Sequence, residues 1–518
     1  MSIHKKKLSA FFLMVLFIAV SDISFAQEKK EYLIENYGAI SGGKTLNTEA
    51  IQKTIDIASA NNGGKVIIPK GDYLTGTIEM KSNVELYLDN EARLLGSTNP
   101  SDYYKLEMKG RPESIKKDDN SQMALIVAYK ADNISISGKG TIDGQGRALA
   151  LKIDSLHHAG VVVDPHYWGR PNERMRPKLI RLSTCNNVSL SKATFRNSAC
   201  WGLSFELCEN LVIDGITIFN RAYWNNDGID ISDSKNVKVI NCDINSADDG
   251  ICLKSYYPGY ANDSIYIANC TIRSSASAIK FGTASFGGFK NVTIENIKIF
   301  DTFRSSIAIE SVDGGIIENI KVSNIVAKNT GNAIFIRLGH RAGAKPGIVK
   351  NIHIKDMKVE VPFGRPDLNY DLRVGTGHHN IIPSWITGIP GHNVENVLLE
   401  NIEITYPGRA SKGQSYFGLS RLDQFPEKIE NYPEFSMFGE VPSWGMYVRH
   451  ATGIEMKNVT LKLNDHDFRP ALIFQNVKKI DLQKMMLPEN FKHEQIVLKN
   501  SSEFSMTPKK EDLLRIIE

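Results

Sequence analysis

Three aspartates stand in two near copies of one short pattern. The stretch "NDGIDIS" from Asn226 aligns with "DDGICLK" from Asp248, and Asp249 follows Asp227 by 22 residues (249 − 227 = 22). If the copies are neighbouring strands of a parallel sheet, about 4.8 Å apart, Asp227, Asp248 and Asp249 lie close together. Like charges at that range raise the pKa of at least one carboxyl, which then stays protonated beside ionised partners. A carboxyl that donates a proton, next to one that activates water, is what cleavage of a glycosidic bond requires.

Other interpretations of the same residues stay open. Asp-Gly and Asp-Asp-Gly are common turn formers, so the pattern also fits solvated bends. Clustered carboxylate oxygens are ligands for Ca²⁺, which makes a calcium site an alternative. A carbohydrate-binding solenoid without activity is disfavoured, because binding alone gives no reason to crowd three carboxylates.

A repeat predicts the elements that position these acids. Short runs of alternating aliphatic residues, each headed by Asn or Asp, begin at Asn187, Asn210, Asn236, Asp263 and Asn291, in steps of 23, 26, 27 and 28 residues. Later copies begin near Ile316, Asn351, Asn396 and Asn458. Units of this size cannot close a core alone but can share one when stacked. We therefore predict an all-β fold, a right-handed parallel β-helix (solenoid). A β-propeller fits less well, because its blades need hairpins that the sequence lacks.

The alignment continues through three further coils, "SAIKFG", "SSIAIE" and "NAIFIR", and separates inward from outward positions. One column reads Asp227, Asp249, Ser277, Ser305 and Asn332. Two outward rows are expected, namely Asp230, Cys252, Lys280, Ala308, Phe335 and Ser232, Lys254, Gly282, Glu310, Arg337. Asn241, Asn269, Asn296 and Asn319 are expected to form one inward Asn ladder.

Four segments are predicted along the chain. Residues 1–26 have a basic start, a short apolar run and small residues before Gln27, which is typical of a signal peptide. A membrane anchor is the alternative, but the run is shorter than the roughly 20 residues that span a bilayer. Residues 27–130 form an N-terminal cap and the first coils, with a helix that starts at Thr48 as N-cap and buries Ile51, Ile55 and Ala58. Residues 131–480 form the β-helix catalytic domain, with an irregular excursion over 409–447, and 481–518 form a C-terminal segment.

Composition excludes some classes of function. The formal charge of +4 over 518 residues names no partner, and no basic stripe with interleaved aromatics indicates nucleic-acid binding. The six cysteines permit disulfides, but buried free thiols are favoured, and no Cys/His spacing indicates a metal site. We expect a monomer with no cofactor, no bound metal and no transmembrane segment after signal removal.

The residues from about Glu31 to Leu472 resemble glycoside hydrolase family 28, the polygalacturonase family. "YGAISGGKTLNTEAIQKTIDIASANNGGKVIIPKGDY" resembles the family's cap, Asn225-Asn226-Asp227 its Asn-Thr-Asp motif, and Asp248-Asp249 its paired acids. The resemblance implies an inverting hydrolase with Asp248 as general acid and Asp227 and Asp249 holding the water. It also implies that acid and base stand about 6.5 to 9.5 Å apart.

Two departures from the family bear on the substrate. The family's Gly-His-Gly is Ala276-Ser277-Ala278 here, and its Arg-Ile-Lys is matched to Arg337-Leu338-Gly339. The residues expected to bind substrate are Asn225, Lys254, Lys280, Arg337, His340 and Arg341. Aromatic residues, namely Trp201, Tyr256, Tyr257, Trp385 and the Tyr416 to Trp444 region, either stack on sugars or pack in the fold.

The predicted function is that of a secreted or periplasmic hydrolase acting on a polysaccharide or oligosaccharide that contains galacturonic acid, with exo action favoured. Alternatives are a rhamnogalacturonan hydrolase, a hydrolase of another acidic or galactose-based polysaccharide, and a calcium-dependent lyase.

Overall fold

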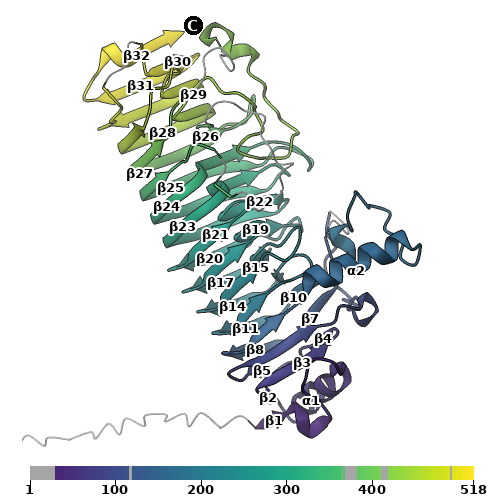
Figure 1. The fold of residues 1–518 in the computed structure, drawn as a ribbon. Helices are drawn as coiled ribbons and strands as arrows, with labels where there is room; N and C mark the ends of the chain where they lie inside the picture. The colour runs from purple at the N-terminus through teal and green to yellow at the C-terminus, as the bar shows by residue number, and fades with distance from the viewer. Residues whose placement is uncertain are drawn as a thin grey trace, which may run out of the picture.

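The computed structural model describes residues 30–115, 120–364, 366–367, 382–409, 418–489 and 493–517. Their strands wind into one tall column of stacked coils (Figure 1). Over these ranges 32 strands hydrogen-bond into a continuous sheet, and the pairings between its strands are parallel. The predicted right-handed parallel β-helix is confirmed. The predicted signal peptide, residues 1–26, lies outside the described residues.

Each coil contributes strands to three faces of the column. The first face begins with the following strands: β1 (Glu31–Leu33), β2 (Gly64–Ile68), β5 (Val84–Leu88), β8 (Asp132–Gly138), β11 (Asn186–Ser191), β14 (Glu209–Asp214), β17 (Lys235–Ile240) and β20 (Asn262–Ala268). The second face begins with the following strands: β3 (Gly71–Thr75), β6 (Ala92–Gly96), β9 (Thr141–Asp143), β12 (Thr194–Arg196), β15 (Thr217–Asn220), β18 (Asp243–Ser246) and β21 (Thr271–Ser274).

The third face carries the aspartates and is called the site face below. Its strands are β4 (Ile78–Glu79), β7 (Ala124–Tyr129), β10 (Lys178–Ser183), β13 (Leu203–Glu206), β16 (Ile229–Ser232), β19 (Ile251–Ser255), β22 (Ile279–Ser285), β26 (Ser384–Thr387), β30 (Ile496–Lys499) and β32 (Leu514–Ile517). Further strands are longer and most bend across two or three faces: β23 (Gly288–Ser311), β24 (Ile316–Leu338), β25 (Ile348–Glu360), β27 (Val394–Tyr406), β28 (Met446–Leu463), β29 (Leu472–Gln483), and the shorter β31 (Ser502–Thr507) on the first face.

Aliphatic side chains fill the column because alternate residues of every strand point inward. On the site face one inward row is Leu203, Ile229, Ile251, Ile279 and Ile307, all fully buried and in register from coil to coil. Burying such a side chain stabilises the fold by roughly 1.5 to 3 kcal/mol. The alternate residues of the same strands face outward. The first predicted outward row, Asp230 to Phe335, is paired in register throughout, whereas the register shifts between Leu253 and Ser255, so Gly282 is not paired with Lys254 and the second predicted row is interrupted there.

A helix closes the N-terminal end of the column, as predicted. The helix α1 (Thr48–Ala60) packs Ile51, Ile55 and Ala58 onto the first coils. The predicted N-cap is displaced by one residue: Thr48 is the first helical residue, and its hydroxyl accepts a hydrogen bond from the Gly76 amide instead. At the other end, β30, β31 and β32 continue the parallel pairing past residue 480, so the coils extend into the predicted C-terminal segment.

The asparagine ladders differ from the prediction. Their side chains lie on the surface, not in the core, and bond from coil to coil in two separate rows. Asn241, Asn269 and Asn296 share one row, and its next member is Asn324. Asn319 belongs to the other row, where its amide donates to Asn291. These asparagines adopt positive φ at the bends, a conformation for which Asn is well suited.

Two parts of the chain stand out from the column. The helix α2 (Gly146–His158) projects sideways (Figure 1). The segment 418–445, which begins with the short helix η4 (Leu419–Gln424), covers the C-terminal part of the site face. The remaining short helices are η1 (Ile34–Tyr37), η2 (Pro100–Asp102), η3 (Glu173–Met175) and η5 (Glu511–Leu513). None of the helices described is long and apolar enough to cross a membrane.

Candidate active site

Asp227 and Asp249 stand just before β16 and β19, in equivalent places of neighbouring coils. The register pairs Asp230 with Cys252, and the Gly228 amide donates to the Asp249 carbonyl at 2.9 Å. Glycine is required after each aspartate, because a Cβ at Gly228 would lie 2.4 Å from the carbonyl oxygen of Gly250. The repeated Asp-Gly thus lets two coils approach closely while each presents a carboxyl.

The three aspartates meet as predicted. One carboxylate oxygen from each of Asp227, Asp248 and Asp249 lies within 4.8 Å of the others. Asp227 and Asp249 are each only 3% exposed, whereas Asp248 is half-buried and therefore the most accessible of the three. The two buried carboxyls, Asp227 and Asp249, are expected to titrate at different pH values because they lie so close together.

The pKa values of the two buried acids, Asp227 and Asp249, are shifted in opposite directions. Burial raises the pKa of Asp227 well above its ordinary value, and the carboxyls of Asp230 and Asp248 raise it further. Burial is the largest influence on Asp249 too and raises its pKa, but Lys280, whose ammonium lies 3.4 Å away, together with Lys254, Arg304 and the Ser277 amide, outweighs burial and holds the pKa of Asp249 below its ordinary value. Asp249 is therefore the anion of the pair, and Asp227 is the group that tends to keep a proton.

A fourth acid, Asp230, belongs to this cluster and was not predicted as a site residue. It is fully buried on β16, and burial raises its pKa to about 6. Its place in the outward row beside Asp227 was the signal that could have identified it. The ammonium of Lys254 lies 3.2 Å from Asp230 and 3.6 Å from Asp227, so one cation serves both carboxyls.

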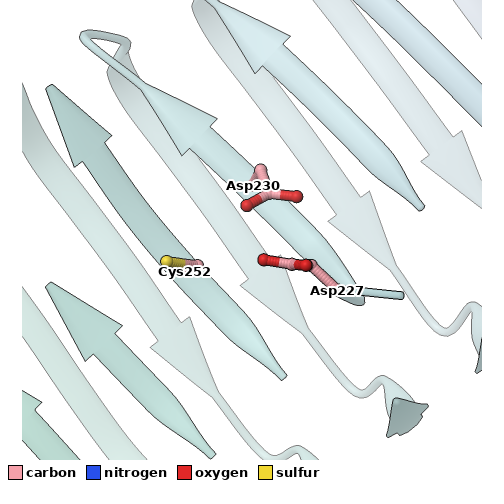
Figure 2. A group of neighbouring side chains, drawn as sticks. All are labelled: Asp227, Asp230 and Cys252. Carbon is pink, nitrogen blue, oxygen red and sulfur yellow. The ribbon is translucent and has the colours of Figure 1, made fainter. Parts of the chain in front are cut away.

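Asp227, Asp230 and Cys252 are neighbours on the site face, at the adjacent strands β16 and β19 (Figure 2). An oxygen or sulfur atom from each lies within 4.8 Å of the others, a spacing that metal ligands also adopt. The Lys254 ammonium lies among them, since it also donates to the Cys252 sulfur at 3.3 Å. An ammonium thus already supplies the positive charge that a metal would bring to this trio.

Lys254 and Lys280, both predicted to bind substrate, lie beside the acids, and both are buried. Lys254 stands over the Trp201 ring at 4.4 Å, and Lys280 donates to the Tyr432 hydroxyl at 3.1 Å. Tyr432 comes from the segment 418–445. The next residue along the outward row of Lys254 that carries a charge is Glu310, which is 2% exposed and whose pKa burial raises to about 8.

Arg337, which is predicted to bind substrate, makes several contacts within the protein. Arg337 is 1% exposed and donates to the Thr387 hydroxyl and to the carbonyls of Gly388, Glu427 and Lys428. All of its bonded partners are protein groups, two of them in the segment 418–445. Arg337 therefore fastens that segment onto the column.

The other residues that are predicted to bind substrate also contact protein groups. Arg341 pairs with Asp313 at 2.7 Å, and the His340 ring lies 3.2 Å from the Gly343 carbonyl. Asn225 accepts a hydrogen bond from Arg176 at 2.7 Å, which fixes the turn that precedes Asp227. Ser277, which stands where the family has histidine, donates its backbone amide to the Asp249 carboxylate at 3.0 Å.

On the C-terminal side of the acids, apolar side chains of the segment 418–445 cover the site face. Ala308, Phe335 and Trp385 occupy successive outward positions and form one cluster with Phe425 and Phe438 of the covering segment. The Trp385 ring lies 4.5 Å from that of Phe438, so the packing interpretation of this tryptophan is the right one. Trp444 is likewise fully buried in the column, while Tyr416 lies outside the described residues.

The six cysteines are all buried and unpaired, as predicted.

Comparison with known proteins places the chain in a family. Residues 59–413 match the sequence profile described as Glycosyl hydrolases family 28. A relative from Vitis vinifera, "Probable polygalacturonase", is 25% identical over 73% of this chain and 74% of its own length. The "Exo-poly-alpha-D-galacturonosidase" of Dickeya chrysanthemi is 28% identical over 51% of this chain and 49% of its own length.

A solved structure supports the fold. The family 28 exopolygalacturonase of Yersinia enterocolitica superposes with a TM-score of 0.66 at 21% identity, covering 88% of this chain and 79% of that one. Its likeness extends the sequence match along most of the column. Since the family profile spans well over half of the chain, the protein is a glycoside hydrolase and belongs to glycosyl hydrolases family 28.

Proposed function

We propose that this protein hydrolyses α-linked galacturonic acid in pectic polysaccharides or their oligosaccharides, with inversion of configuration. The observation that carries the proposal is the cluster of Asp227, Asp248 and Asp249 on the site face. The names of the relatives from Vitis vinifera and Dickeya chrysanthemi support the substrate. Asp248, the most accessible acid, gives its proton to the leaving oxygen, while Asp249 and Asp227 hold and activate the water.

Of the two buried acids that are proposed to activate the water, Asp249 is ready to act as a base and Asp227 is not. Asp249 is ionised and can accept a proton from water at once. Asp227 must first lose its own proton, and the nearby Lys254 ammonium favours that loss. Because Asp227 must be ionised to act, the activity depends on the positive charge of Lys254.

The carboxyls are closer than expected for this mechanism. Inverting glycosidases commonly hold acid and base about 6.5 to 9.5 Å apart, and retaining ones about 5 to 5.5 Å. Here the nearest oxygens of the three carboxyls lie within 4.8 Å. The decisive measurement is therefore the anomer released first, followed by proton NMR: β-galacturonate supports inversion, and α-galacturonate contradicts it.

We further propose exo action and export from the cytoplasm. The apolar cluster of Phe335, Trp385 and Phe438 limits how far a polysaccharide can extend over the site face toward the C-terminal coils. The leader-like residues 1–26 support export. Exo action predicts mono- or disaccharide products from the first minutes of digestion, whereas a ladder of long oligosaccharides contradicts it.

A second candidate substrate is rhamnogalacturonan, in which galacturonate alternates with a neutral sugar. On the C-terminal side of the acids, Lys280, Arg304 and Arg341 each have an acidic partner, and Glu310 adds a further carboxyl. A second uronate bound there would meet cations that are already neutralised. This charge balance favours a neutral sugar at that position.

The test compares wild type, Asp248→Asn and a matched control, Asp243→Asn, which makes the same change on the second face. Each is incubated with homogalacturonan, rhamnogalacturonan and their oligosaccharides, with and without EDTA, and products are identified by mass spectrometry. Saturated products that survive EDTA and disappear only in Asp248→Asn support the hydrolase. Unsaturated, EDTA-sensitive products would indicate a lyase, and the faster polymer distinguishes the two substrates.

A further inference from the structure

A cavity of about 540 Å³ opens on the site face, on the N-terminal side of the acids. Arg181 and Glu206, from β10 and β13, form its floor. Arg111, from the segment that precedes β7, forms one wall, and Tyr256 and Tyr257, which follow β19, form the opposite wall. The cavity is large enough for one or two sugar units.

Basic side chains gather around one carboxylate, Glu206, in the floor of the cavity. Arg181 holds the Glu206 carboxylate through two hydrogen bonds of 2.9 and 3.0 Å, and Arg111 donates to it at 2.8 Å. The Lys178 ammonium lies 3.7 Å from the same carboxylate. Three basic groups therefore share the Glu206 carboxylate, while Lys105 stands with Glu107 and Glu113 elsewhere in the lining, so the lining as a whole carries three basic and three acidic side chains.

The aromatic wall is held rigidly. The Asp233 carboxylate accepts hydrogen bonds from the Ser255 hydroxyl at 2.5 Å and from the amides of Tyr256 and Tyr257 at 2.7 and 3.3 Å. The Ile115 amide donates to the Tyr256 carbonyl at 3.2 Å, which ties the two walls together. A fixed aromatic wall opposite an arginine is suited to a sugar that carries a carboxylate, because the ring packs on the sugar and the guanidinium pairs with the acid.

The cavity lies on the same face as the acids. Arg181 is in register with Ser204, and Ser204 with Asp230, so two coil steps of about 4.8 Å separate Arg181 from Asp230. Trp201 bridges the interval: it packs with Tyr256 and Tyr257, and the ammonium groups of Lys178 and Lys254 lie 4.2 and 4.4 Å from its ring. A saccharide chain that reaches the acids can therefore extend over Trp201 into the cavity.

We propose that this cavity is a distal subsite that binds a uronate residue of the saccharide chain through Arg111, with Tyr257 packing against the sugar. The inference rests on the proposed function for the identity of the chain. Arg111 is the ligand because it is only half-buried and its guanidinium faces the Tyr257 ring at 6.0 Å, whereas Arg181 is committed to Glu206 and to the Gln122 carbonyl.

The test measures how turnover depends on chain length. Galacturonate oligosaccharides of two to six units are compared in wild type, Arg111→Gln and a control, Arg93→Gln, which breaks an exposed pair with Asp72 far from the site face. In wild type we expect kcat/KM to rise with length. In Arg111→Gln the ratio of kcat/KM for the pentamer to that for the dimer should fall about tenfold, the effect of one lost charge-assisted hydrogen bond. Arg93→Gln should keep the wild-type ratio.

A second comparison isolates the carboxylate. Binding of the pentamer and of its methyl ester to Asp248→Asn is measured by calorimetry, with and without Arg111→Gln. A pentamer that loses affinity on Arg111→Gln, while the methyl ester does not, supports the subsite, even if no pectic substrate is hydrolysed and the proposed function fails. Hydrolysis with an unchanged length ratio and unchanged pentamer affinity overturns the subsite and leaves the proposed function intact.

Discussion

Lys254 is predicted to set the acidic limit of activity, and its replacement by methionine tests this. The side chain is buried and its ammonium lies 3.6 Å from Asp227 and 3.2 Å from Asp230. Methionine keeps much of the volume but removes the charge. Asp227 then has no cation to oppose burial and its two acidic neighbours, so its pKa must rise further and its ionised form appears only at higher pH.

The size of the shift follows from the distance. Two unit charges 3.6 Å apart interact by about 1 kcal/mol at the dielectric constant of water and by about 5 kcal/mol at an effective value of 20. At 1.36 kcal/mol per pKa unit, this corresponds to roughly one to three units. The acidic limb of the kcat/KM profile, which reports the free enzyme, should move to higher pH by at least about one unit.

The opposite substitution should move the same limb the other way. Asp230→Asn removes a carboxyl that raises the pKa of Asp227 and leaves Lys254 to pair with Asp227 alone. The acidic limb should then move to lower pH. Lys235→Met, an exposed lysine on the first face, is the matched control and should leave the profile unchanged.

The assay is the pH dependence of kcat/KM between pH 3 and 9 on an oligosaccharide that wild type cleaves, with melting temperature recorded at each pH. Breaking a buried ion pair commonly costs about 3 to 5 kcal/mol, so Lys254→Met must be measured where it is still folded. If both variants are folded and the acidic limb stays in place, Asp227 does not need to be ionised, and the assigned role is wrong.

Three further predictions concern stability. Burial raises the pKa of Glu310 from 4.5 to about 8, so its stabilising effect is complete below pH 4.5 and is lost as the pH rises to 8, by about 5 kcal/mol in total. The melting temperature of Glu310→Gln should therefore rise relative to that of wild type as the pH increases from 5 to 9. A difference that stays constant over this range would contradict the raised pKa of Glu310. Asn236 adopts a φ of 54° and donates a hydrogen bond to Asn210 in the surface ladder. Asn236→Ala should therefore lower the free energy of unfolding, measured in urea, by about 1 to 2 kcal/mol, and Asn236→Gly should lower it by less. Equal losses in the two variants would mean that backbone strain is not the cause. Gly228→Ala should prevent the coils from closing at the acids and lower both soluble yield and activity, and a variant with wild-type values would refute the close packing.

The sequence determined the repeat and what the repeat implies. Because neighbouring coils of a parallel sheet stack in register, the alignment of Asp227 with Asp249 and of Asp230 with Cys252 already specified which side chains meet and which face outward. The glycine after each aspartate, the buried cysteines and the helical cap could also be predicted from local sequence patterns. These features depend on residues close in sequence or separated by one regular step.

Tertiary structure decided the features that depend on segments far apart in the chain. Arg337 has an outward position in the repeat, but the segment 418–445 folds over it and takes its hydrogen bonds. Lys280 meets Tyr432, and Arg111 meets Glu206, across 152 and 95 residues. No periodicity encodes such contacts, because the path of an irregular segment is set by the surface that it finally covers. The repeat places the acids, and the loops decide which charges remain available beside them.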